Sequence, residues 1–274
     1  MAVTMAEISK LRHLTGAGLM DCKKALAEAN NDMEAAIEII RKKGQAVAAK
    51  REDREAAEGC VLSASNGKFA AIVALKCETD FVAKNEGFVN LTKKILAAVM
   101  EAGVKTLDEV KALSIEGKTV ADLIVEEIGK TGEKMELGAY ECIEAPSTVA
   151  YNHFGNKLAS IVGFNEEGVD AQVAKEVAMQ VAAMNPVAVC REEVPAKIAE
   201  QELEIGREKA REEGKPEAII NRIAEGRLNK FYKENVLMEQ EFVSDNSMDI
   251  ATYLKKQSEG LKAISFRRVN LNED

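Results

Sequence analysis

Two apolar runs separated by an Asn-Gly pair place the strongest constraint on the fold. The runs are GCVLSAS (59–65) and KFAAIVALKC (68–77), with Asn66 and Gly67 between them. An Asn-Gly pair readily adopts the positive φ angles that a tight antiparallel hairpin needs. The second run is almost continuously apolar, which is typical of a buried strand. The sequence therefore predicts an antiparallel hairpin that leads directly into the polar segment ETDFVAKNEGF (78–88).

The first 45 residues predict three short helices. Thr4 and Glu7 have the spacing of a capping box at the start of the first helix. The segment TGAG (15–18) separates the first helix from the second, and NND (30–32) separates the second from the third. The alanine-rich, charged stretch 45–56 has no broad apolar stripe, so we interpret it as a linker that can be helical. We expect a three-helix domain and linker over residues 1–54.

Strand and helix patterns recur along the rest of the chain. We expect a first α+β half at 55–139 and a related second half at 140–274, the latter beginning with the strands ELGAYECIEA and KLASIVGFN and a helix at 169–184. Residues 195–232 predict a protruding antiparallel helical hairpin, and 236–260 a C-terminal module, followed by a strand that pairs with the sheet of the second half. The predicted fold class is α+β with antiparallel sheets.

Composition argues against several classes of function. There are 37 Lys and Arg against 46 Asp and Glu, and the net charge of −9 disfavours a dedicated nucleic-acid binder. No apolar run approaches the roughly 18 residues of a membrane helix, and the N-terminus lacks the apolar stretch of a secretory signal. Five scattered Cys and two distant His predict reduced thiols and no metal site. We expect a cytoplasmic protein with no membrane partner.

The sequence contains none of the motifs that would indicate a common enzyme class. It lacks the phosphate-binding glycine motifs, HExxH and GxSxG. His153 could act as a base and Cys77 as a nucleophile, but a structural histidine and a buried thiol are the favoured interpretations. The helical hairpin fits a partner-binding arm and a simple spacer equally well. We expect no catalytic residues and no enzymatic activity.

The segment Thr79-Asp80-Phe81-Val82 allows two interpretations. In one, Thr79 or Asp80 caps a helix and Phe81 packs into the local core, and composition alone favours this alternative. In the other, Phe81 points outward and forgoes about 1.5 to 3 kcal/mol of burial, which makes sense only if a partner supplies the pocket.

Five segments carry a resemblance to a known family. In order, they are TGAGLMDCKKAL (15–26), CETDFVAKNEGF (77–88), AMQVAAMNP (178–186), GKPEAIINRIAEGRLNKF (214–231) and EQEFV (239–243). Together they span nearly the whole chain, and they resemble the bacterial elongation factor Ts family, guanine nucleotide exchange factors for elongation factor Tu. The alternative is a scaffold that resembles the family but has lost exchange activity.

The resemblance implies a fold, a partner and a mechanism. It implies a ubiquitin-associated-like N-terminal domain, a core of two α+β halves, a coiled-coil hairpin and a C-terminal module. The implied function, in translation elongation, is GDP release from elongation factor Tu, so that GTP can rebind. Asp80 and Phe81 match residues that approach the Mg²⁺ and phosphate site of the GTPase, with Thr79 and Val82 completing the segment. GDP, GTP and Mg²⁺ then belong to the partner, and this chain needs no cofactor.

Further partner contacts follow from the resemblance at other positions. The family usually has isoleucine-glycine where this chain has Leu158-Ala159, and some members have histidine at the position of Gln180. The matched positions are Lys23, Leu158, Ala159, Gln180, Phe242 and Val243.

Overall fold

The computed structural model describes residues 3–273, and its N-terminal part is a bundle of three helices. These are α1 (Met5–Thr15), α2 (Leu19–Glu28) and α3 (Met33–Lys50). The Thr4 side chain accepts a hydrogen bond from the Glu7 amide and the Glu7 carboxylate accepts one from the Thr4 amide, which confirms the capping box. Because α3 continues to residue 50, the first part of the expected linker, residues 45–50, is helical.

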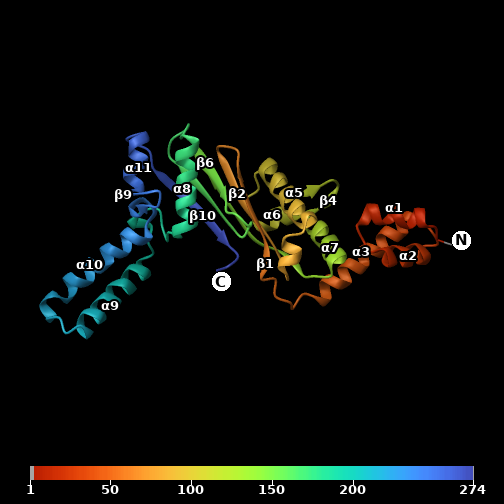
Figure 1. Ribbon diagram of the computed structural model, residues 1–274, viewed down its shortest axis with the longest axis horizontal. Helices are drawn as coiled ribbons and strands as arrows, with labels where there is room; N and C mark the ends of the chain where they lie inside the picture. The colour runs from red at the N-terminus through yellow and green to blue at the C-terminus, as the bar shows by residue number, and fades with distance from the viewer. Residues whose placement is uncertain (1–2, 274) are drawn as a thin grey trace.

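Helix α3 joins this bundle to the rest of the molecule. It packs against α7 (Val120–Thr131), and two glycines lie at the crossing. A Cβ added to Gly129 would lie 3.0 Å from the Cα of Gly44, so the two helices approach more closely than larger residues would allow. The N-terminal bundle and the hairpin of α9 (Ala196–Glu212) and α10 (Glu217–Asn235) lie at opposite ends of the long axis (Figure 1).

The predicted hairpin is confirmed and forms two strands of the first sheet. Strand β1 (Glu58–Ser65) pairs antiparallel with β2 (Phe69–Cys77), and Gly67 in the turn has a φ of 96°. Strand β5 (Met135–Glu144) pairs with the other edge of β2, so the order is β1-β2-β5.

Strand β2 is buried on both faces, which explains its nearly continuous apolar sequence. One set of alternate side chains packs beneath the helices, including α5 (Glu86–Ala102) and α7; the other set faces the second sheet. The helix-facing residues are Phe69, Ala71, Val73, Leu75 and Cys77, and the sheet-facing residues are Ala70, Ile72 and Ala74.

The second sheet has the order β10-β7-β6 and is also antiparallel. Its strands are β6 (Ser147–Asn152), β7 (Leu158–Phe164) and β10 (Ala263–Asn270), and α8 (Ala171–Met184) packs on it. The expectation that the C-terminal strand joins the second sheet is confirmed by its pairing with β7. The core thus has two sheets face to face, with helices on the outer side of each.

One assignment made from the sequence is wrong. ELGAYECIEA was expected in the second set of strands, whereas it corresponds to β5 and pairs with β2 in the first sheet. The expected boundary between 139 and 140 consequently falls inside a strand. On the side away from β10, β7 pairs instead with β6, which lies between the two segments that were expected to be strands.

The next unit along the chain is a helical hairpin. Helices α9 (Ala196–Glu212) and α10 (Glu217–Asn235) form the antiparallel hairpin, which projects from the body (Figure 1).

Among residues 3–273, no helix combines the length and apolar character needed to cross a membrane. The remaining elements are α4 (Asp80–Ala83), α6 (Leu107–Ala112), β3 (Ser114–Ile115), β4 (Lys118–Thr119), η1 (Arg191–Glu193), η2 (Leu237–Glu239), β8 (Glu241–Phe242), β9 (Asp245–Asp249) and α11 (Ile250–Gln257).

Candidate functional site

The segment that follows β2 folds into one helical turn, α4, and Thr79 caps it. The Thr79 hydroxyl oxygen accepts a hydrogen bond from the Val82 amide at 3.5 Å. The same hydroxyl donates to Glu133 Oε1 at 2.6 Å, and the Thr79 amide donates to Glu133 Oε2 at 3.0 Å. The cap is therefore itself held by a carboxylate from the connection between α7 and β5.

The helical turn directs Phe81 into solvent. Val82 packs against the core of the first half and Ala83 is buried, whereas the Phe81 side chain is 83% exposed. Successive residues of a helix are rotated by about 100°, so a turn that buries residues 82 and 83 can leave residue 81 on its outer side. The interpretation that placed Phe81 in the core is wrong, although composition alone favoured it.

Charged pairs surround this turn. Lys84 Nζ lies 2.6 Å from Asp80 Oδ2, and this hydrogen bond holds the pKa of the Asp80 carboxyl below its usual value. Glu58, at the start of β1, forms a second pair with Lys157 at 2.8 Å. The exposed Phe81 ring therefore extends from a surface on which an ionised carboxylate is its immediate neighbour.

The C-terminal candidate residues form a second cluster, mostly buried. Gln180 is fully buried on α8; its amide nitrogen donates to the Glu241 carbonyl at 3.1 Å, and its Oε1 accepts from the Val243 amide at 2.9 Å. Phe242 is 3% exposed and stacks on Tyr253 with ring centroids 4.2 Å apart. Val243 alone reaches the surface, at 50% exposure.

The other candidates lie elsewhere. Lys23 is exposed on α2, in the N-terminal bundle. Leu158 is half-buried at the start of β7, and Ala159 is fully buried in the layer between the two sheets. The structure thus brings Gln180 together with residues 242–243, but leaves Lys23 on a separate unit.

His153 and Cys77, the candidate base and the candidate nucleophile, lie in environments that favour a structural role. The Tyr151 hydroxyl lies 3.0 Å from His153 Nδ1. Burial raises the pKa of the Cys77 thiol to about 12, which disfavours the thiolate that a nucleophile needs. Within residues 3–273, no three His, Cys, Asp or Glu side chains are grouped so that they could hold a metal ion.

The sequence did not point to Glu133 or Phe154. Glu133 holds the Thr79 cap, and only the pairing of β2 with β5 brings these positions together. Phe154, between β6 and β7, is 96% exposed. Phe154 precedes Gly155 in a turn-rich stretch, and this position could have indicated from the sequence that the ring is exposed.

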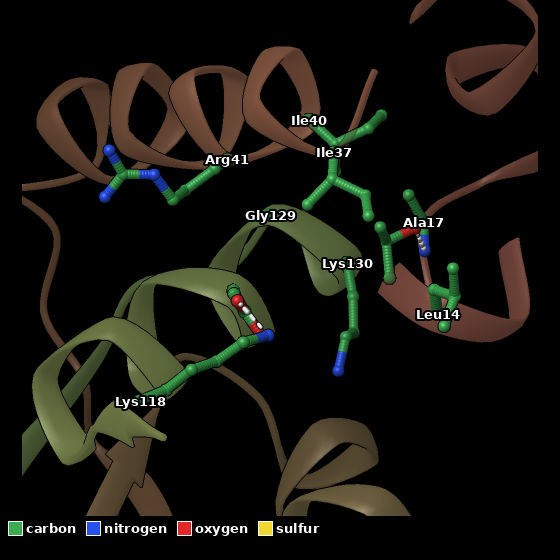
Figure 2. A pocket seen from close by; sticks show the side chains of 11 residues that line it. Leu14, Ala17, Ile37, Ile40, Arg41, Lys118, Gly129 and Lys130 are labelled. Atoms are coloured by element: carbon green, nitrogen blue, oxygen red, sulfur yellow. Dashed lines mark hydrogen bonds and ion pairs between the residues drawn. The ribbon is translucent and has the colours of Figure 1, made fainter. Parts of the chain in front are cut away.

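A cavity of about 240 Å³ lies between the N-terminal bundle and α7 (Figure 2). Leu14, Ala17, Ile37 and Ile40 supply apolar walls, and the Lys130 side chain extends from α7 close to Ala17. None of its lining residues belongs to the segment around Phe81 or to the cluster around Gln180, so the cavity is separate from both.

These features define an α+β protein that displays an aromatic side chain on a capped, braced turn. The family model described as Elongation factor TS matches residues 78–273. The Elongation factor Ts of Porphyromonas gingivalis (strain ATCC 33277) is 58% identical over 275 residues, covering 100% of both chains. That of Amoebophilus asiaticus is 50% identical, covering 98% of this chain and 99% of the relative. The chain belongs to the elongation factor Ts family.

Proposed function

We propose that this chain binds elongation factor Tu and promotes release of GDP, so that GTP can rebind during translation elongation in the cytoplasm. The observation that carries the proposal is the exposure of Phe81 on a turn whose neighbours are anchored in the core. Family membership supports it, because the matched segment begins at residue 78 and includes this turn.

The proposed mechanism uses Asp80 and Phe81 together. Burying a Phe side chain in a partner pocket gains about 1.5 to 3 kcal/mol, and each 1.4 kcal/mol corresponds to a tenfold change in an equilibrium constant. The ring therefore supplies about one or two factors of ten. Asp80 brings a carboxylate to the edge of the Mg²⁺ and phosphate site, where added negative charge weakens phosphate binding. The remaining coupling comes from the wider interface.

Linkage requires the effect to be reciprocal. Whatever the factor removes from the nucleotide affinity of elongation factor Tu, the nucleotide removes from the affinity for the factor. GTP can therefore displace the factor and complete the cycle. In this mechanism the chain forms no covalent bond and holds no cofactor; GDP, GTP and Mg²⁺ belong to the partner.

The secondary positions have two kinds of role in this proposal. Lys23 and Val243 are exposed and available for direct contact. Gln180 and Phe242 are buried, so they act by holding the Val243 segment. Ala159 also acts indirectly, because its side chain is enclosed between the sheets. We retain as proposals the ubiquitin-associated-like character of residues 1–54 and the coiled-coil character of residues 195–232.

The test is the release rate of a fluorescent GDP from the cognate elongation factor Tu, with and without the full chain. The proposal predicts strong acceleration that saturates with factor concentration, and dissociation of the complex when GTP is added in excess. Binding without acceleration would instead support the scaffold alternative.

A further inference from the structure

The end of β2 and the start of β5 are joined by side chains beyond their last backbone pair. Cys77 and Met135 are the final partners of the ladder. Past this point, Glu133 accepts two hydrogen bonds from Thr79, one from the amide at 3.0 Å and one from the hydroxyl at 2.6 Å. Because the acceptor is a carboxylate, these bonds are stronger than those between neutral groups.

A second carboxylate makes the reciprocal connection. Glu78 Oε1 accepts a hydrogen bond from the Lys134 amide at 2.6 Å. Both Glu78 oxygens also lie 3.2 Å from Arg51 Nη1, at the end of α3. The Glu78 side chain is only 16% exposed, so this ion pair is partly shielded from solvent. The peptide before α4 is thus tied both to the α7–β5 connection and to α3.

We infer that Glu133 is a positioning residue for Phe81: its two hydrogen bonds to Thr79 fix the direction in which the turn presents the ring. The Thr79 hydroxyl has one proton, and its donation to Glu133 directs an oxygen lone pair toward the Val82 amide. Phe81 is mostly in solvent, so its direction depends on the backbone of α4. This inference rests on the proposed exchange function and deepens it.

Two substitutions of Glu133 distinguish the loss of both acceptor oxygens from the loss of one. Glu133→Ala removes both acceptors. Glu133→Gln keeps the size but replaces one oxygen by an NH₂ group, which cannot accept from the Thr79 amide or hydroxyl. Glu136→Gln is the matched control, because this carboxylate lies three residues later and is 3.4 Å from Lys134 Nζ, without a bond to Thr79.

The first readout is the rate of fluorescent GDP release as a function of factor concentration, using full-length variants. A loosened turn presents Phe81 correctly for a smaller fraction of time, whereas the wider interface is unchanged. We expect Glu133→Ala to lower the maximal rate about tenfold with a nearly constant half-saturating concentration. Glu133→Gln should lie between Glu133→Ala and wild type, and Glu136→Gln should match wild type.

The second readout is amide hydrogen exchange in the free protein. The Ala83 and Lys84 amides donate to the carbonyls of Thr79 and Asp80 within the turn, at 3.1 and 3.0 Å. Both Glu133 variants should exchange these amides faster, whereas β2 keeps its protection. Glu133→Gln supplies this result even if Glu133→Ala fails to fold.

The outcomes separate this inference from the proposed function. Unchanged protection of the turn, or an unchanged maximal rate in both Glu133 variants while wild type accelerates release, would overturn the inference and leave the exchange function intact. A raised half-saturating concentration at an unchanged maximal rate would also overturn it, since Glu133 would then serve binding alone. No acceleration by wild type would reject the proposed function and the inference together.

Discussion

Two acid-Phe-Val triplets in this chain have opposite burial. In Asp80-Phe81-Val82 the ring is in solvent and the valine packs inward, whereas in Glu241-Phe242-Val243 the ring is buried and the valine is exposed. The first triplet belongs to a helical turn; in the second, Phe242 ends strand β8 and stacks on Tyr253. The comparison shows that the supporting contacts, rather than the local composition, decide which side chain is available to a partner.

The largest expected difference between the triplets is in stability. Phe242→Ala removes a buried aromatic ring and its stacking contact with Tyr253, so we expect it to lower the free energy of unfolding by about 3 to 5 kcal/mol. Phe81→Ala removes an exposed ring and should change this quantity by no more than about 0.5 kcal/mol. Urea unfolding of both variants measures the contrast, and equal losses would show that the burial assignment of one triplet is wrong.

An intermediate effect is expected at Gln180, which supports the second triplet. Gln180→Ala leaves the Glu241 carbonyl and the Val243 amide without their buried partner, at a cost of about 1 to 3 kcal/mol. Gln180→Glu is the informative companion, because it keeps an acceptor for Val243 but loses the donor for Glu241. Thermal unfolding should therefore rank wild type above both variants. A Gln180→Ala protein as stable as wild type would contradict a stabilising role for the two hydrogen bonds of Gln180.

The smallest expected effect concerns the acid of the first triplet. The hydrogen bond from Lys84 holds the pKa of Asp80 below its usual 3.8. The contribution of this pair is therefore present above that pH and is lost as the pH falls through the lowered pKa. In Lys84→Met, the Asp80 pKa should move back up. An NMR titration of the Asp80 carboxyl carbon measures the shift, and an unchanged pKa would exclude Lys84 as its cause.

Elements whose formation depends on residues close together in the chain were predicted correctly from the sequence. The Asn66-Gly67 hairpin and the capping box at Thr4 are confirmed because their signals lie within a few positions. The sequence did not predict that β5 joins the first sheet, since by itself it does not distinguish β2 from β7 as the strand beside which β5 lies. The direction of Phe81 also depends on a distant partner of its cap, because Glu133 lies 54 residues after Thr79.

The most direct test of the account compares the two exposed phenylalanines. Phe81→Ala and Phe154→Ala each remove a ring that is mostly in solvent, but only Phe81 lies on the braced turn beside Asp80. Fluorescent GDP release from elongation factor Tu should lose about one to two factors of ten in acceleration with Phe81→Ala, as the burial energy of one ring implies, and little with Phe154→Ala. Full acceleration by Phe81→Ala would contradict the central claim.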